Sequence, residues 1–309
     1  MTDTAILAED LRKTFGEVVA VDHISLAVPR GTVLGLLGAN GAGKTTMVRM
    51  LTTVLEPTSG RGVVNGFDVQ QFPQAVRRSI GLAGQYAAVD ENLTGRENLF
   101  LVGRLNHMSK PDARTRAAEL LDQFHLTDAG DRPVRTYSGG MRRRLDLGAA
   151  LVTHPPVLFL DEPTTGLDPG SRLDLWGVIE TLVADGTTVL LTTQYLEEAD
   201  RLADNIVVID QGRIAAEGTA KQLKSRLGDT VIEFEFRTAE TASAAATLLG
   251  VGTSAGTIVR QVMTDGATTL RDALNQLAAN ALAPSHVALR EPTLDDVFLT
   301  LTGTNGAGE

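Results

Sequence analysis

Cysteine is absent from the sequence, which excludes disulfide bonds, thiolate metal sites and catalytic thiols. Basic residues are fewer than acidic ones, and the formal net charge is −10. A protein that binds nucleic acid without sequence preference needs a basic surface to neutralise phosphates, so we expect no nucleic acid as a partner. The five histidines show no metal-ligand spacing, and we expect no zinc site.

Long hydrophobic runs are lacking as well. The N-terminal segment MTDTAILAEDLRKTFG is charged and has no apolar core of a signal peptide. No later stretch approaches the ~20 apolar residues of a membrane-spanning helix, so we expect any membrane role to come through a partner. Yet 43% of the 309 residues are hydrophobic, which is enough for one domain of ordinary size and a smaller second one.

Short apolar runs alternate with segments of helical period from the start of the chain to about residue 227. This alternation predicts an α/β domain over residues 1–227, with a helical insert at about residues 86–153. Four apolar runs end next to Gly, Asp or Thr and are predicted to be buried parallel strands: Val33–Leu37, Val157–Leu160, Val189–Leu191 and Ile206–Ile209. Ligand sites gather at the carboxyl ends of such strands.

The composition shifts after residue 227, and residues 228–309 are predicted to form a small α/β domain. The run VIEFEF alternates as a strand whose edge is free to pair, Thr238–Leu249 has helical character and His286–Arg290 resembles a last strand. A terminal helix at Leu294–Leu301 would carry one apolar stripe. We expect this domain to serve assembly and regulation, but closure of the domain's own core explains the stripe equally well.

The segment Gly38–Thr45 fits G-x-x-x-x-G-K-[ST], follows the apolar strand Val33–Leu37 and precedes a helical segment from Lys44 to Leu55. Glycines let backbone amides approach phosphate oxygens, and the helix N-terminus adds a favourable dipole. Lys44 is expected to reach the β- and γ-phosphates of ATP, and Thr45 to ligate Mg²⁺. The other candidate nucleotide contacts here are Gly38, Ala39, Asn40, Gly41, Ala42, Gly43 and Thr46. The strand–loop–helix context argues against the competing interpretation, a glycine-rich turn with a surface lysine.

A second apolar strand, Val157–Leu160, ends in two adjacent carboxylates. We assign Asp161 to the metal side and Glu162 as the general base that polarises the attacking water. A strand ending in Asp-Glu is commonplace and, taken alone, is explained as well by a solvated turn. A matching phosphate loop in the same chain favours the catalytic interpretation.

Ser138, Gly139 and Gly140 stand at the start of an amphipathic segment that runs on to Leu151. A hydroxyl, bare backbone amides and the positive end of a helix dipole together make a second anion cradle. One nucleotide already has its phosphates bound by the first cradle. The second is therefore expected to serve the nucleotide of another copy of the chain.

From about Ile6 to Gly218 the chain resembles the ATP-binding-cassette (ABC) ATPase family, because five motifs occur in the family's order. GANGAGKTT resembles Walker A, YSGGMRRRLDLGAAL the signature and VLFLDEP Walker B. Gln85 resembles the Q-loop residue, Asp168 lies in a D-loop-like TGLD, and Phe15 stands where the family stacks an aromatic on adenine. The resemblance implies a P-loop NTPase core, a mixed sheet with a helical insert, and nucleotide contacts from these three residues, with Gln85 also on Mg²⁺.

In the family two such domains close head-to-tail, so the resemblance implies a homodimer with two shared ATP sites. Three positions depart from the family pattern. Met141 replaces the usual Gln and Tyr137 the usual Leu, and neither change touches the binding groups. Gln194 replaces the switch His, so it is expected to donate a hydrogen bond to the γ-phosphate without taking up a proton.

The runs TTQYLEEAD and EPTLDDVFL resemble the daunorubicin/doxorubicin-resistance group of ABC exporters, whose ATPase and membrane subunits are separate chains. The resemblance implies an ATP-hydrolysing subunit that powers efflux of a hydrophobic drug or lipid. It would lie at the cytoplasmic face of the cell membrane, bound to an integral-membrane permease subunit that selects the cargo.

The alternative is a soluble ABC ATPase with a mechanical, non-transport role. Such proteins place a very long coiled coil between Walker A and the signature, and the interval from Thr46 to Tyr137 leaves no room for one. Ribosome-binding relatives carry two cassettes per chain, and only one is present. The basic run Arg142–Arg144 points in several directions on a helix and is predicted to be a solvated face.

Overall fold

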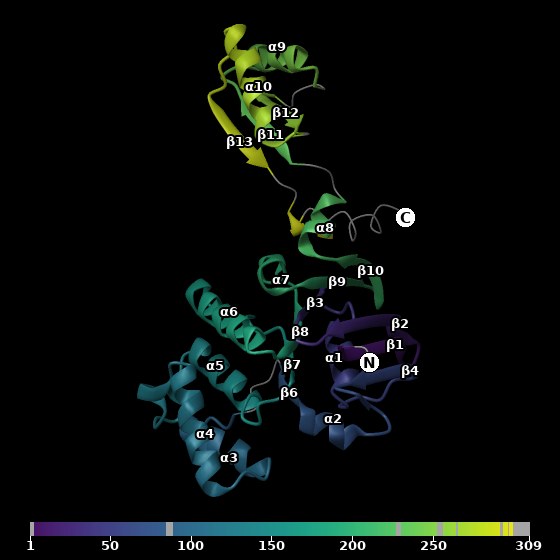
Figure 1. Ribbon diagram of the computed structural model, residues 1–309, viewed down its shortest axis with the longest axis vertical. Helices are drawn as coiled ribbons and strands as arrows, with labels where there is room; N and C mark the ends of the chain where they lie inside the picture. The colour runs from purple at the N-terminus through teal and green to yellow at the C-terminus, as the bar shows by residue number, and fades with distance from the viewer. Residues whose placement is uncertain are drawn as a thin grey trace. The chain divides into compact units, whose positions relative to one another are not determined.

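The computed structural model describes residues 3–84, 89–226, 230–251, 256–263, 265–290, 293–295 and 297–298. The chain divides into two compact units, Met1–Ala220 and Lys221–Glu309 (Figure 1). Within the described ranges, no helix is both long and apolar enough to cross a membrane.

A six-stranded sheet in the order β10-β9-β3-β8-β7-β6 forms the centre of the first unit. Its strands are β3 (Val33–Leu37), β6 (Ile80–Ala83), β7 (Val157–Asp161), β8 (Thr188–Thr193), β9 (Asn205–Asp210) and β10 (Arg213–Gly218). All neighbours are parallel except β10, which runs antiparallel to β9. Every residue of β3, β7 and β8 is buried, as expected for parallel strands covered on both faces. The four predicted strands are confirmed.

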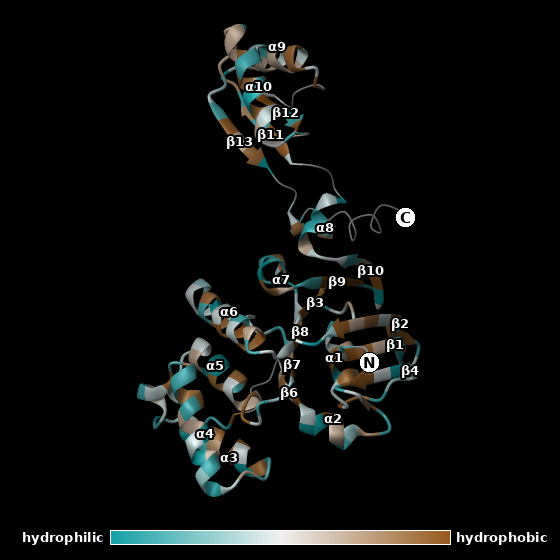
Figure 2. Ribbon diagram, in the orientation of Figure 1, coloured by the Kyte–Doolittle hydropathy of each residue, from teal (hydrophilic) through white to brown (hydrophobic). Residues whose placement is uncertain are grey.

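A second, antiparallel sheet in the order β2-β1-β4-β5 packs with the helix α1 against one face of the central sheet. The elements are β1 (Thr4–Phe15), β2 (Val18–Pro29), α1 (Lys44–Leu51), β4 (Ser59–Val64), β5 (Phe67–Asp68) and α2 (Pro73–Ser79). Figure 2 shows the hydrophobic residues of these strands. The predicted helix to Leu55 is too long, because Thr53 adopts a left-handed φ of 63° that ends α1.

The predicted helical insert is built from three helices, which lie beside β6 and β7, away from β1 and β2 (Figure 1). The elements are α3 (Gly95–Leu105), α4 (Lys110–Gln123), the short 3-10 turns η1 (Thr127–Ala129) and η2 (Val134–Thr136), and α5 (Gly139–Ala150). Thr94 and Glu97 form a capping box that starts α3. These helices share one hydrophobic core with α6 (Pro169–Ala184) and the other face of the central sheet. The core sets the position of α5 relative to the ends of β7 and β8.

The second unit contains a three-stranded antiparallel sheet in the order β12-β11-β13. Its elements are β11 (Val231–Glu235), α9 (Ala239–Leu249), β12 (Ile258–Val262), α10 (Gly266–Ala279) and β13 (His286–Arg290); α8 (Ala220–Ser225) follows β10 at the boundary between the units. The prediction of a free edge on the VIEFEF run is wrong. β11 is the central strand, and it is paired on both sides because β12 and β13 supply the edges.

Only part of the predicted terminal helix Leu294–Leu301 lies within the described residues. Leu294 and Val297, two members of its apolar stripe, are each 3% exposed. The amide of Val297 donates to the carbonyl of Thr293 at 3.3 Å, which is a helical contact. The chain itself therefore covers Leu294 and Val297, whereas Phe298, a third member of the stripe, is half-buried.

A buried carboxylate lies between two helices of the first unit. Glu198, on α7 (Leu196–Leu202), is fully buried, and its Oε1 accepts a hydrogen bond from the indole Nε1 of Trp176 on α6 at 3.0 Å. Burial raises the pKa of Glu198 above its usual value of 4.5. The folded protein therefore favours the neutral acid, and the unfolded chain does not.

The stability that neutral Glu198 contributes is present below its unfolded pKa and is lost as the pH rises through the raised folded pKa. Glu198→Gln imitates the neutral acid, so the variant should lose less stability than the wild type as the pH rises above the usual value of 4.5 and through the raised pKa of the folded state. Denaturant unfolding followed by fluorescence of Trp176, the sole tryptophan, measures this difference. Identical pH dependence in the two proteins would contradict it.

Candidate nucleotide-binding site

The loop between β3 and α1 has no room for side chains at two of its glycines. A Cβ on Gly38 would lie 2.4 Å from the carbonyl oxygen of Ile209, and one on Gly43 would lie 2.4 Å from that of Ala20. Gly43 also has a φ of 110°, which L side chains rarely adopt. A Cβ on Gly41 would meet nothing within 4 Å. The loop is thus packed tightly against β9 and β2 at Gly38 and Gly43, and it is open at Gly41.

Lys44 is the first residue of α1 and is only 4% exposed. Its Nζ donates to the carbonyls of Gly38 at 2.7 Å and Ala39 at 3.1 Å, and lies 3.7 Å from Oε1 of Glu162. Burial lowers the pKa of Lys44, and the carboxylates of Glu162 and Asp161 oppose that shift. The side chain is therefore a buried cation held in the loop, which excludes the surface-lysine interpretation.

Hydroxyl and carboxylate oxygens meet where β7 and β8 end. Oδ1 of Asp161 accepts hydrogen bonds from Thr45 Oγ1 at 3.1 Å and from Thr192 Oγ1 at 2.6 Å. Such hard oxygen ligands suit Mg²⁺, which is typically held by one or two protein groups together with phosphates and water. The described part of the chain has no cluster of three or more His, Asp or Glu side chains that could hold a metal. Thr45 and Asp161 fit a magnesium ion shared with a nucleotide.

Glu162 follows β7 directly and adopts a left-handed φ of 51°, which is uncommon outside glycine. Its amide donates to Thr192 Oγ1 at 3.0 Å, and its Oε2 accepts from Thr165 Oγ1 at 3.3 Å. The side chain is 9% exposed and its Oε1 faces Lys44. This backbone conformation therefore turns the carboxylate toward the phosphate loop.

A cavity of about 410 Å³ lies above the phosphate loop, and Lys44, Thr45 and Glu162 line it, whereas Asp161 is not among its lining residues. Its walls include Asn40, Gly41, Gly43, Lys44, Thr45, Thr46, Glu162, Thr165 and Gln194. Gln194 reaches it from the turn that joins β8 to α7. The structure thus brings together, at the carboxyl edge of the sheet, residues predicted from three separate motifs.

One described candidate stands apart from this cavity, and another cannot be placed relative to it. Phe15, at the end of β1, is 50% exposed, and Lys13 Nζ lies 5.4 Å from its ring centroid. Phe15 does not line the cavity. Gln85 lies outside the described residues.

The second cradle also lies outside the cavity. Ser138 caps α5, where its Oγ accepts from the amide of Met141 at 3.2 Å, and Ser138 and Gly139 are exposed. A Cβ on Gly140 would lie 2.5 Å from Oγ of Ser171. Asp168 caps α6 by accepting from both the amide and the hydroxyl of Ser171, which lowers the pKa of Asp168. Within the described structure, none of Ser138, Gly139 and Gly140 lines the cavity above the phosphate loop of the same chain.

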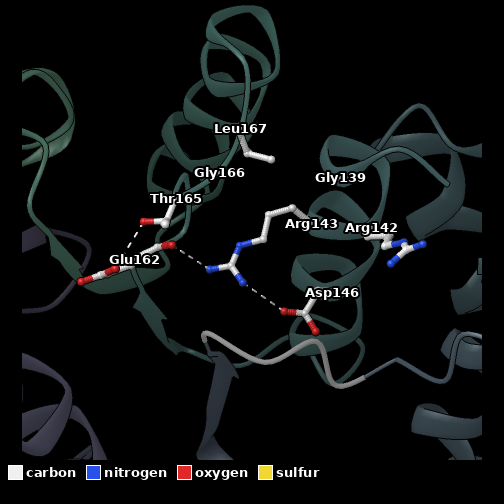
Figure 3. A pocket seen from close by; sticks show the side chains of 8 residues that line it. All are labelled: Gly139, Arg142, Arg143, Asp146, Glu162, Thr165, Gly166 and Leu167. Carbon is white, nitrogen blue, oxygen red and sulfur yellow. Dashed lines mark hydrogen bonds and ion pairs between the residues drawn. The ribbon is translucent and has the colours of Figure 1, made fainter. Parts of the chain in front are cut away.

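The basic run was predicted to be a solvated face, and this is wrong for two of its three residues. The side chain of Arg143 is 14% exposed, between α5 and the loop after β7 (Figure 3), and that of Arg144 is 19% exposed and lies 3.9 Å from Asp174. Arg142 is more exposed, at 36%, and forms an ion pair with Glu91. Three consecutive arginines look alike in a sequence. Only the direction in which α5 packs distinguishes them.

Comparison with known proteins assigns the family. The model of the ABC transporter family matches residues 21–165. A daunorubicin resistance ATP-binding protein of Streptomyces coeruleorubidus is 53% identical over 98% of this chain and 97% of its own length. A doxorubicin resistance ATP-binding protein of Mycobacterium tuberculosis is 48% identical over 97% of this chain and 94% of its own.

A solved structure of an ATP-binding subunit of an ABC transporter shares the fold with a TM-score of 0.66 and 28% identity. The match covers 72% of this chain and 93% of that one. The predicted family and fold class are confirmed. The chain belongs to the ABC transporter ATP-binding proteins and, among them, to the daunorubicin/doxorubicin-resistance group.

Proposed function

We propose that this chain binds and hydrolyses ATP and thereby powers efflux of a hydrophobic drug or lipid through a separate integral-membrane permease subunit. The observation that carries the proposal is the single cavity that gathers Lys44, Thr45, Glu162 and Gln194 above the phosphate loop. The resistance names of the relatives support the drug class. The site of action is the cytoplasmic face of the cell membrane, where the permease holds the chain.

The residues divide the chemistry among them. The amides of the loop and the positive end of α1 bind phosphates, and Lys44 neutralises charge on the β- and γ-phosphates. Thr45 and Asp161 would hold Mg²⁺, which when bound supplies Lewis-acid stabilisation of phosphate charge. Glu162 accepts a proton from the attacking water. Gln194 orients the γ-phosphate by a neutral hydrogen bond.

The exposed Ser138 and Gly139 favour a homodimer. In our proposal, these residues and Gly140 cap the γ-phosphate bound to the other copy, and Asp168 lies at the same junction. Two equivalent sites result, each built from both chains. Phe15 is half-exposed and thus available to stack on adenine.

We place the permease contact on the surface from Gln85 through α3. Leu101 and Leu105 on α3 are 43% and 69% exposed, which provides apolar contact area for a partner helix. In our proposal, Gln85 transmits the contact with the γ-phosphate to that surface and adds a contact to Mg²⁺. Residues 228–309 serve assembly and regulation, because every element needed for ATP chemistry precedes them.

Lys44→Ala and Glu162→Gln should separate binding from hydrolysis. Lys44→Ala removes the phosphate-neutralising charge, so both ATP affinity and turnover should fall. Glu162→Gln removes only the base, so turnover should fall by about 10²- to 10⁴-fold while ATP still binds. Size-exclusion chromatography of Glu162→Gln should show a dimer with ATP and Mg²⁺. A monomer both with and without nucleotide would count against shared sites.

Gln194→Ala should reduce turnover strongly, because the γ-phosphate loses an orienting hydrogen bond. Gln194→His should keep a substantial part of the activity, since the imidazole also donates a hydrogen bond. Steady-state ATPase assays of the full chain compare the two variants. An alanine variant as active as the wild type would show that the side chain has no catalytic role.

Truncation after about Gly228 should leave ATP binding measurable while weakening the dimer or its complex with the permease. Calorimetric titration with ATP and pull-down by the permease measure the two effects. A folded truncation without any nucleotide binding would refute the assembly role.

A further inference from the structure

Arg143 joins three parts of the first unit through one guanidinium group. It lies on α5, five residues after Ser138. Its Nη1 donates a hydrogen bond of 2.6 Å to the carbonyl of Gly84, the residue immediately before Gln85. Its Nε donates a hydrogen bond of 2.7 Å to the carbonyl of Pro163. The signature helix is thereby tied to the start of the Q-loop and to the loop after β7.

The same group also binds the backbone of the two acidic residues of Walker B. Nη2 of Arg143 donates to the carbonyls of Asp161 and Glu162, each at 3.2 Å, and Nη1 lies 3.5 Å from Oδ2 of Asp146. With Pro163, the carbonyls of three consecutive residues accept hydrogen bonds from one guanidinium group. The middle residue of these three, Glu162, is the one with the left-handed φ.

Apolar packing does not fill the space on this side of the loop. A pocket of about 330 Å³ lies there, lined by Gly139, Arg143, Glu162, Thr165, Gly166 and Leu167 (Figure 3). A loop that borders open space depends on polar contacts to keep its position. Hydrogen bonds from a buried guanidinium group are strong and directional contacts of this kind. Asp146, 2% exposed, supplies the nearby negative charge.

We propose that Arg143 is a positioning residue that holds the loop carrying Glu162 in the geometry for hydrolysis and links it to the signature helix. Arg143 acts on the reaction through Glu162. Because Ser138 and Gly139 begin the same helix, four to five residues before Arg143, binding of that cradle to the second copy's nucleotide would change the position of Glu162 through Arg143. This inference rests on the proposed ATPase function.

Lysine cannot replace this contact. Its ammonium keeps the charge but is a single point with three donors, whereas the planar guanidinium reaches carbonyls on two separate segments at once. Arg143→Lys should therefore lower kcat about ten- to a hundredfold, the range that a small misplacement of a catalytic group produces. ATP affinity, measured by calorimetry, should stay within about threefold of wild type. The reason is that, in the described structure, Arg143 contacts none of the phosphate-loop residues that line the cavity.

Arg116 provides a matched control. It is also buried, and it donates to the carbonyls of Leu151 at 2.9 Å and Val152 at 3.3 Å, with no contact to the Walker B loop in the described structure. Arg116→Lys should lower the thermal midpoint while leaving kcat within about twofold of wild type. Equal losses of kcat in Arg143→Lys and Arg116→Lys would show that Arg143 has only a structural role, and would contradict the proposal.

A double-mutant cycle decides whether Arg143 acts through Glu162. In the Glu162→Gln background, Arg143→Lys should have almost no further effect on residual turnover, because the base that it positions is gone. Equal fold losses in both backgrounds would overturn the proposal, as would an Arg143→Lys variant with wild-type kcat. Arg143→Gln serves as the second variant if the lysine protein does not fold. Failure of the ATPase function itself would appear separately, as wild-type activity that Glu162→Gln leaves intact.

Discussion

The hydroxyl of Thr192 contacts both acidic residues at the end of β7, one through its carboxylate and the other through its backbone amide. It donates to Oδ1 of Asp161 at 2.6 Å and accepts the amide of Glu162 at 3.0 Å. Thr192 is fully buried at the end of β8, and β8 pairs in register with β7, where Asp161 lies opposite it. The sheet therefore fixes the hydroxyl, and the hydroxyl fixes the side chain of one acid and the backbone of the next. Glycine contacts beneath the phosphate loop then bring Lys44 to the same edge.

Much of this arrangement was predictable because the chemistry is local. A phosphate loop needs glycines, lysine and threonine at fixed spacing, and a buried parallel strand needs a continuous apolar run. Each pattern is complete within about ten residues. The positions of β3, β7, β8 and β9, and the meeting of Lys44, Thr45 and Glu162, followed from those patterns together with the rule for the carboxyl ends of parallel strands.

The errors share a different cause. Whether β11 is an edge or a central strand depends on which strands pair with it, and β12 and β13 come from later parts of the chain. Whether an arginine is solvated depends on the face that its helix buries, which three adjacent arginines do not reveal. The early end of α1 at Leu51 reflects a left-handed Thr53, a residue that ordinary propensities do not place there. Each error concerns tertiary context, which periodicity does not encode.

The loop after β7 separates two spaces, since Glu162 and Thr165 line both the 410 Å³ cavity and the 330 Å³ pocket. One side of it faces the phosphate loop, and the other faces the signature helix. That helix contacts the loop through the guanidinium of Arg143, and it contacts the following helix α6 at Gly140, where Ser171 leaves no room for a Cβ. Because tight contacts transmit displacement rather than absorb it, a shift of α5 would also displace the loop that carries Glu162. The arrangement thus gives a physical route from the helix that begins at Ser138 to the carboxylate of Glu162 in the same chain.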